Sequence, residues 1–271
     1  MSEPMALYLK RSLSPKALTA QRGALPASGE WVVELHESLP STQARAKELG
    51  LAGTPRAIVA AACQTEGRGR RGRRWESPEG GLYFSLLYRP RLTSSDLPLL
   101  SLAAALAVEA AITTTAGLSV ELKWPNDVLK DDLKVCGILS EAVFRDGIFC
   151  VTGLGMNLVT PSGLLPPEVG RRAGALFESL PPSETVGALW TATVLHFEGR
   201  LEQLEDGRKA LLLEDYRKKC ASIGRIVRVT SGGEEVAGLC LGVGEEGELL
   251  VRTEDGPRSF RVGDVIHAAL G

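Results

Sequence analysis

The residues with the clearest chemical potential lie between positions 64 and 75, which read QTEGRGRRGRRW. Five arginines and three glycines fall within residues 67–74, and Trp75 follows them. Glycine lets a backbone approach a ligand closely, and the rigid guanidinium fork of arginine suits phosphate or carboxylate groups. The indole of Trp75 adds a flat face on which a base could stack. This segment therefore predicts a site for an anionic ligand that carries a ring.

An arginine- and glycine-rich run can also be a disordered tail that binds nucleic acid or stays in solvent. The position of this run in the chain argues against that interpretation. Apolar runs at 57–63 and 82–88 flank it, and both have the composition of buried strands. A loop tethered between two core strands is held in place, as binding loops are. The run is not a Walker A loop, because no Gly-Lys-Ser/Thr ends it, and no strict Gly-x-Gly-x-x-Gly opens a helix.

Two further motifs follow at the ends of predicted strands. Residues 123–127 read KWPND, and Lys134 lies eleven residues after Lys123. Pro125 breaks the strand, so the polar groups emerge on a loop where they could bind phosphate and a metal ion. Residues 153–157 read GLGMN, whose glycines either face a ligand or form a bulge. Taken alone, each motif is also compatible with an ordinary exposed turn.

The bulk composition limits the class of protein. A net charge of −2 and a pI near 6.0 do not indicate a nucleic-acid-binding protein, so the positive charge of the arginine run is a local feature. The five cysteines are scattered without Cys-x-x-Cys pairs, which argues against a disulfide framework or a zinc site. The longest apolar region, 99–112, contains Glu109 and is too short to span a bilayer. We therefore expect a cytoplasmic protein with no membrane partner.

The order of predicted elements suggests three parts, at 1–30, 31–221 and 222–271. The first is a short extension in which one helix near 15–22 is expected. The second contains a strand at 31–35, helices at 41–49 and 101–115, a strand that reaches Lys123 and a hairpin from 135–143 and 148–154. A Pro/Gly-rich stretch then leads into helical sequence from 183 to about 220. About five short strands follow, as in a small barrel, and this barrel carries five arginines against eight carboxylates.

The combination is more specific than its parts. The arginine loop, KWPND with Lys134 at its spacing, GLGMN and an early Ser41-Thr42-Gln43 together resemble the biotin–protein ligases in order and spacing, from about Trp31 to Leu158. The resemblance implies an α+β fold: a catalytic domain with a mixed β-sheet and flanking helices, related to class II aminoacyl-tRNA synthetases, followed by a small SH3-like β-barrel.

The resemblance also implies a reaction. Such ligases activate biotin with ATP and Mg²⁺ to biotinyl-5′-AMP and pass the biotinyl group to one lysine of a biotin carboxyl carrier protein. Because a carboxylate must attack a phosphate, the site needs concentrated positive charge. Lys134, Arg70 and Lys123 are the expected catalytic residues. ATP and Mg²⁺ are co-substrate and activator, and no tightly bound prosthetic group is expected.

The match to the family assigns residues to each substrate. Polar side chains and glycine backbone are expected to hold biotin: Ser41, Thr42, Gln43, Gln64, Arg68, Gly69, Arg70, Lys134 and Gly137. Cations, an aromatic ring and amides are expected to hold ATP: Arg68, Arg70, Arg73, Trp75, Lys123, Asn126, Asp127, Lys134 and Asn157. Asp127 is the candidate contact to the ATP-bound Mg²⁺. Gln43 stands where relatives usually carry Asn, and the arginine loop is expected to close over the adenylate.

Two rival functions remain. A lipoate or octanoate ligase would share the fold and the acyl-adenylate chemistry, but it would need a pocket for an apolar ring and normally lacks this arginine motif. A nucleic-acid-binding module would more often have a basic barrel than an acidic one. Only about thirty residues precede the catalytic part, too few for a helix-turn-helix domain, so we expect a short-form ligase without repressor function. Many relatives dimerise through the catalytic sheet, and an exposed edge strand here could do the same, although no residue pattern fixes the oligomeric state.

Overall fold

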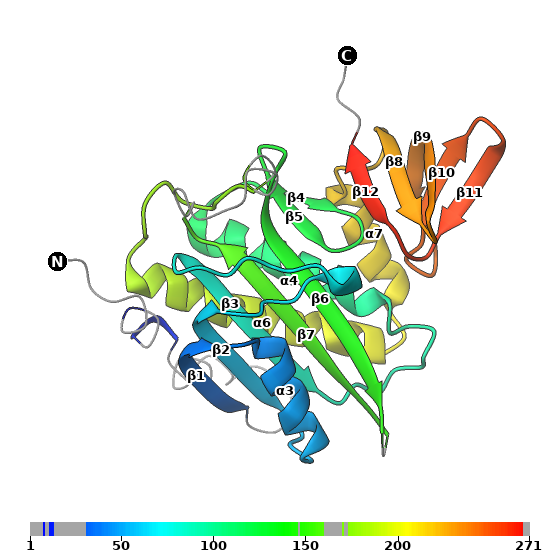
Figure 1. The fold of residues 1–271 in the computed structure, drawn as a ribbon. Coiled ribbons are helices and arrows are strands. Elements are labelled where there is room, and N and C mark those ends of the chain that lie inside the picture. Colours follow the sequence, from blue (N-terminus) through cyan, green and yellow to red (C-terminus); the bar gives the residue numbers. More distant parts are fainter. Residues whose placement is uncertain are drawn as a thin grey trace.

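The computed structural model describes residues 8, 11–13, 31–145, 147–159, 170 and 173–267. They form a seven-stranded sheet with helices on both faces and a separate five-stranded sheet at the C-terminal end (Figure 1). The helix expected near residues 15–22 lies outside the described residues.

The larger sheet is mixed, as the sequence predicted. Its strand order is β1-β2-β3-β7-β6-β5-β4, with β1 parallel to β2 and every other pair antiparallel. The two apolar runs that flank the arginine loop are the central strands β2 and β3, and every residue of β3 is buried. The strands of this sheet are β1 (Val32–Leu39), β2 (Ala57–Gln64), β3 (Gly81–Tyr88), β4 (Glu121–Lys123), β5 (Asp127–Lys130), β6 (Leu133–Phe144) and β7 (Ile148–Asn157).

Helices cover both faces of this sheet. Helix α3 (Thr42–Leu51) packs on β2, β3 and β7. Helix α4 (Leu99–Ala116) packs on α6 (Ser183–Glu205) and on β4, β5, β6 and β7 (Figure 1). Helix α4 is long and apolar enough to cross a membrane, but 67% of it is buried inside the protein, and it serves as the central core helix. It ends at Gly117, whose φ of 66° closes the helix in the left-handed conformation that favours glycine.

The helical stretch predicted from 183 to about 220 consists of two helices. Helix α6 ends at Glu205 and α7 (Lys209–Lys219) begins after a short turn. Gly207 in this turn has φ 73°, a left-handed conformation that an α-helix cannot continue through. The break lets α7 turn away from α6 and reach β4 and the C-terminal sheet.

The five predicted C-terminal strands are all present. They form an antiparallel sheet in the order β11-β10-β9-β8-β12, in which no pairing between β11 and β12 closes a barrel among the described residues. The strands and their order are compatible with the expected SH3-like barrel. Their bounds are β8 (Ile226–Ser231), β9 (Glu234–Val243), β10 (Leu249–Thr253), β11 (Gly256–Phe260) and β12 (Asp264–His267).

The KWPND motif joins this sheet to the catalytic part. Trp124 is 2% exposed, and its Nε1 donates to Gly247 O at 2.8 Å, within the turn between β9 and β10. Arg217 of α7 donates to Val243 O at 2.6 Å on the same side. Thus the tryptophan of the motif docks the C-terminal sheet and faces away from the pocket described below.

Candidate active site

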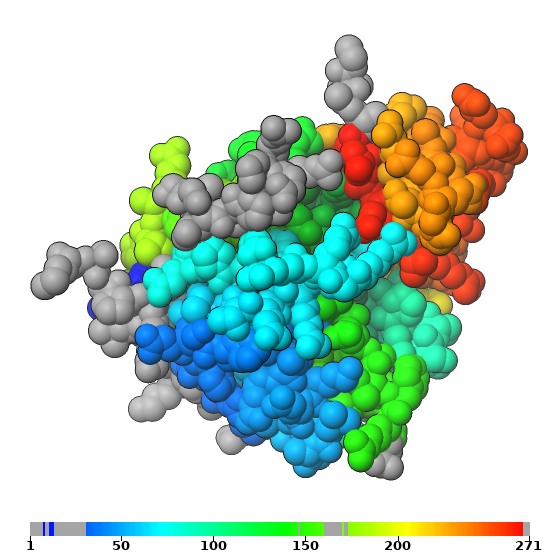
Figure 2. All heavy atoms as spheres, viewed as in Figure 1, coloured from blue at the N-terminus to red at the C-terminus, as the bar shows by residue number. Residues whose placement is uncertain are grey.

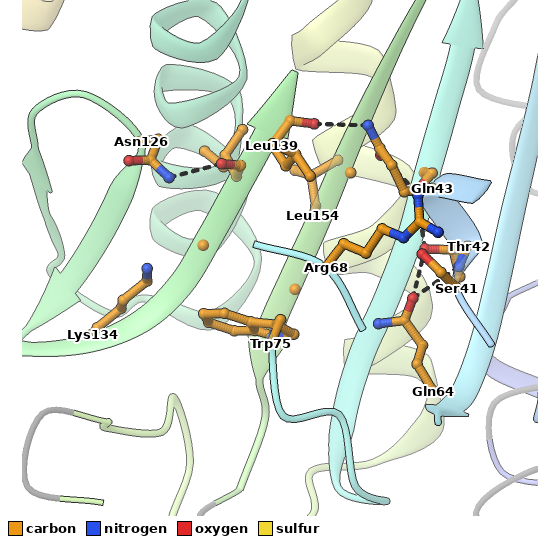
Figure 3. A pocket seen from close by; sticks show the side chains of 15 residues that line it. Ser41, Thr42, Gln43, Gln64, Arg68, Trp75, Asn126, Lys134, Leu139 and Leu154 are labelled. Atoms are coloured by element: carbon orange, nitrogen blue, oxygen red, sulfur yellow. Dashed lines mark hydrogen bonds between the residues drawn. The ribbon is translucent and has the colours of Figure 1, made fainter. Parts of the chain in front are cut away.

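A pocket of about 430 Å³, including space open to solvent, lies where the N-terminus of α3, the hairpin β6–β7 and the arginine loop meet (Figure 3). Nine of the predicted site residues line it: Ser41, Thr42, Gln43, Gln64, Arg68, Trp75, Asn126, Lys134 and Gly137. Segments from most of the catalytic part therefore converge on one cavity.

One wall of the pocket is polar and tightly hydrogen-bonded. Ser41 caps α3 by accepting from Ala44 N at 3.4 Å. The Thr42 N–H donates to Gln64 Oε1 at 2.8 Å, and Gln64 Nε2 donates to Ser77 Oγ at 2.7 Å. Gln64 thus ties the start of α3 to the end of the arginine loop. Side-chain oxygen and nitrogen atoms on this wall suit a neutral polar ring.

The arginine loop itself is folded. Trp75 N donates to Gly67 O at 2.9 Å, and Arg68 pairs with Arg74 in a β-bridge. A Cβ on Gly67 would lie 2.2 Å from Trp75 O, so only glycine permits this crossing. Arg71 has φ 57° within a short 3₁₀ turn, Arg70–Gly72. The run is therefore an ordered loop, and the alternative interpretation as a disordered tail is wrong.

The arginines of the loop face different partners. Arg68 lines the pocket, and no carboxylate of the described residues pairs with it. Arg70 Nη1 donates to Asn126 Oδ1 at 3.0 Å and to Gly263 O at 3.1 Å, and its burial lowers the pKa of the guanidinium. Arg73 reaches Asp264 instead. Figure 2 shows the loop, in cyan, extending to the red C-terminal strand.

Trp75 lies flat against the glycines of the β6–β7 hairpin. A Cβ on Gly155 would be 2.4 Å from its Nε1, and a Cβ on Gly137 would be 2.8 Å from its ring. Lys134 Nζ lies 4.9 Å from the ring centroid, within cation–π distance. Gly137 and Gly155 are therefore needed for the same physical reason, which is that only glycine leaves room for the indole in the pocket (Figure 3).

The predicted catalytic lysine pairs with the predicted metal contact. Lys134 Nζ lies 2.6 Å from Asp127 Oδ1, yet the angles do not satisfy a hydrogen bond, and this buried oxygen has no other partner among the described residues. A carboxylate oxygen with spare coordination capacity fits Mg²⁺, which binds proteins through one or two carboxylates while it also contacts nucleotide phosphates. No cluster of three His, Cys, Asp or Glu side chains that could bind a metal occurs in the described ranges.

Not every predicted residue lines the pocket. Gly69, Arg70, Arg73 and Asp127 lie beside it, in the arginine loop or next to Lys134. Asn157 uses its Nδ2 to donate to Gly174 O at 2.9 Å, which anchors the segment after β7. Lys123 pairs with Asp127 across β4 and β5, and its charge helps to lower the pKa of His267 in the C-terminal sheet.

The sequence reasoning also missed residues that line the pocket. Leu139 belongs to an apolar strand run that carried no distinguishing signal, and Leu154 lies within the GLGMN motif but was given no role of its own. Ser85 is fully buried, and its hydroxyl lies 2.9 Å from Thr42 Oγ1. A lone serine within the otherwise apolar run 82–88 was the available signal for a polar site on that strand.

Two family models match the chain. Residues 35–157, which contain every motif named above, match the biotin/lipoate A/B protein ligase family. Residues 222–268 match the biotin protein ligase C-terminal domain. The second match separates biotin ligases from lipoate ligases, which the first groups together. The chain belongs to the biotin protein ligase family.

Similar proteins agree with this assignment. The bifunctional ligase/repressor BirA of Bacillus subtilis is 32% identical over 237 residues, which cover 85% of this chain and 72% of that protein. The biotin–[acetyl-CoA-carboxylase] ligase of Paracoccus denitrificans is 32% identical over 239 residues, covering 83% of this chain and 96% of the relative. Among solved structures, the biotin protein ligase from Aquifex aeolicus in complex with biotin and ATP has a TM-score of 0.77 at 28% identity, covering 88% of this chain and 99% of its own.

Proposed function

We infer that this biotin protein ligase activates biotin with ATP to biotinyl-5′-AMP and transfers the biotinyl group to a lysine of a biotin carboxyl carrier protein. The observation that carries this conclusion is the single pocket into which Lys134, Arg68, Trp75 and the polar wall at Thr42 converge. Cationic, aromatic and neutral polar groups within one cavity match the three parts of the adenylate: phosphate, adenine and ureido ring.

In the first step, a biotin carboxylate oxygen forms a bond to the α-phosphorus of ATP, and the bond from that phosphorus to the bridging oxygen breaks to release pyrophosphate. Two anions approach each other, so positive charge must be in place beforehand. Arg68 supplies it within the pocket, and Arg70 lies nearby on Asn126. Lys134 would exchange Asp127 for the carboxylate and the α-phosphate. Mg²⁺, when bound with ATP, neutralises triphosphate charge, and Asp127 is the residue suited to contact it.

In the second step, the neutral amine of the carrier lysine attacks the acyl carbon of the adenylate. An amide bond forms, the acyl–phosphate bond breaks, AMP leaves, and the amine loses a proton. Nothing in this step requires a further prosthetic group. Closure of the arginine loop over the adenylate would protect the mixed anhydride from water, as lids do in other enzymes.

The adenine is proposed to stack on the face of Trp75 that is turned away from Gly155. Asn157 would assist at the adenine edge, since its amide lies at the end of β7 and already anchors the neighbouring segment. Lys123 is proposed as a further cation, because it pairs in the β4–β5 ladder with Asp127, the partner of Lys134.

The buried position of α4 fits a soluble enzyme, and a cytoplasmic location stays a prediction. Homodimerisation is also a proposal. Among the described residues β1 pairs only with β2, so its other edge is the proposed site for a second copy, although an edge strand does not by itself select a partner. Absence of repressor activity is tested by a gel shift with biotin-operon DNA at moderate salt.

The deciding experiment incubates the protein with radiolabelled biotin, ATP and Mg²⁺, with and without a biotin carboxyl carrier domain. Retention of label as adenylate, followed by its appearance on the carrier lysine, is the expected result. Parallel reactions with lipoate and octanoate provide the comparison. Adenylate formed from either of these, and none from biotin, would overturn the proposal.

A further inference from the structure

The carboxamide of Gln43 can point in only one direction. Its Nε2 faces Glu141 Oε2 at 2.9 Å, Val151 O at 3.1 Å and Leu139 O at 3.3 Å, all of which are acceptors. If the carboxamide were reversed, its oxygen would face three oxygens and no hydrogen. Figure 3 shows the amide nitrogen directed to Leu139 on β6. The amide oxygen must therefore face the opposite side, toward β3.

On that side, the amide oxygen orders two hydroxyl groups. Ser85 Oγ donates to Gln43 Oε1 at 3.3 Å, and Ser85 Oγ lies 2.9 Å from Thr42 Oγ1. Each hydroxyl has one hydrogen. When Ser85 donates to Gln43, it can only accept from Thr42. Thr42 Oγ1 also lies 3.1 Å from Gln64 Oε1, a second acceptor, so with either partner its one hydrogen is used within the protein. Thr42 then presents only its lone pairs to the pocket that it lines, and these accept from N–H donors.

This arrangement depends on the length of the glutamine side chain and on a glycine opposite it. A Cβ at Gly153 would lie 2.5 Å from Gln43 Oε1, so a larger residue on β7 would displace the amide. A side chain shorter by one methylene could reach Ser85 or the acceptors on β6 and β7, but not both. Gln43 itself is only 4% exposed, which makes each lost partner costly.

We propose that Gln43 and Glu141 are positioning residues for substrate recognition: Glu141 fixes the Gln43 carboxamide, which in turn sets Ser85 and Thr42 to accept from a ring that carries N–H groups. This proposal rests on the proposed function, and it identifies how the site distinguishes a ureido ring from an apolar one. Glu141 lies outside the pocket lining and acts through Gln43.

Biotin-dependent pyrophosphate release tests the proposal, with KM measured separately for biotin and for ATP. Glu141→Leu removes the acceptor, whereas Glu141→Gln keeps an acceptor oxygen of the same shape. We expect Glu141→Leu to raise the biotin KM roughly tenfold, with kcat and the ATP KM changed less than about twofold. Glu141→Gln should stay within about twofold of wild type on all three constants.

Gln43→Glu gives a readout that a purely structural role would not produce. The introduced carboxylate would face Glu141 and two carbonyl oxygens, so the biotin KM should rise on the order of a hundredfold near pH 8. Protonation of the introduced carboxylate restores one donor. At about pH 6 we therefore expect the biotin KM of Gln43→Glu, divided by that of wild type at the same pH, to fall at least tenfold from its value near pH 8. Gln203→Glu on α6, where the native glutamine contacts Arg200, is the matched control and should leave the biotin KM unchanged.

An unchanged biotin KM in folded Glu141→Leu, or a parallel rise in the biotin and ATP KM values, would overturn the proposal. So would a Gln43→Glu defect that does not vary with pH. If Glu141→Leu fails to fold, Gln43→Asn decides, and a wild-type biotin KM in that variant would count against the proposal. A wild-type protein that releases no pyrophosphate with biotin would instead overturn the proposed function, and this inference with it.

Discussion

Asp264 Oδ1, at the start of the last strand, lies 2.6 Å from Arg73 Nη2 in the loop between β2 and β3. The same carboxylate contacts Arg71 at 3.3 Å, and the neighbouring Gly263 O accepts from Arg70 at 3.1 Å. The C-terminal sheet thus holds three arginines of the loop, Arg70, Arg71 and Arg73, in place. This contact gives the C-terminal sheet a defined relationship to the active site, which its sequence alone did not show.

Removal of the Asp264 carboxylate should loosen the loop more than it destabilises the protein. Asp264→Ala frees Arg71 and Arg73, so limited trypsin digestion should cut after them several-fold faster. The free energy of unfolding should fall by less than about 1 kcal/mol, because Arg73 is 60% exposed and such pairs contribute little. Asp255→Ala, in the β10–β11 turn of the same sheet, is the control. Equal digestion rates in both variants would show that Asp264 does not hold the loop.

Lys134→Ala should abolish most adenylate formation. The ammonium group is the cation that the pocket offers next to Asp127 and Trp75, and loss of one such contact to developing charge costs about 3 kcal/mol, or about a hundredfold in kcat. Pyrophosphate release measured at saturating ATP and biotin checks this. Lys218→Ala, at an exposed ion pair on α7, should retain full activity. Near-normal release in Lys134→Ala would remove this lysine from the mechanism.

Gly155→Ala should displace the Trp75 indole. The added methyl group would lie 2.4 Å from Trp75 Nε1, well inside contact distance, and overpacking of this kind costs about 1–3 kcal/mol. We expect weaker ATP binding by calorimetry, together with altered tryptophan fluorescence. Gly199→Ala, on α6, is the control, because a Cβ at this position would have no neighbour within 4 Å. This substitution should stabilise the helix by about 0.5–1 kcal/mol. Unchanged ATP affinity in Gly155→Ala would mean that ATP binding does not depend on the position of the Trp75 indole against Gly155.

Stability should fall as the pH drops from about 6.5 toward 4. Burial, with help from Lys123 and Arg225, lowers the pKa of His267 from 6.5 to about 4. The unfolded chain therefore binds more protons than the folded protein within that window, and the free energy of unfolding decreases there. Because His267 is only partly buried, we expect a loss of about 1–2 kcal/mol from this group.

Urea unfolding at several pH values checks this prediction. His267→Gln should flatten the slope between about pH 6.5 and 4. Part of the slope should remain, because burial also lowers the pKa of His196. Carboxylates with lowered pKa values, such as Glu34 beside Arg45, lose their contribution only below about pH 4, which separates them from the histidines. An identical slope in His267→Gln and wild type would contradict the assignment.

Local sequence predicted the elements because each of them carries a local signal. The central strands β2 and β3 appeared as apolar runs, α3 began at the Ser41 cap, and α4 stopped at Gly117. The helical sequence predicted from 183 to about 220 is confirmed, and the turn at Gly207 divides it into α6 and α7. The three motifs also predicted the location of the pocket. Each of them follows or interrupts a strand whose position is fixed by packing in the core.

The sequence by itself determined the family, the order of the elements and most of the residues that line the pocket. Only the tertiary structure decided what those residues contact. Gln43 meets Glu141 across 98 positions of the chain, and Arg73 meets Asp264 across 191. Ser85 became a site residue because β3 lies beside α3, where the Ser85 hydroxyl meets Thr42. The physical reason is that charge pairing and hydrogen-bond direction depend on groups brought together by packing of the whole core, which no local pattern of side chains encodes.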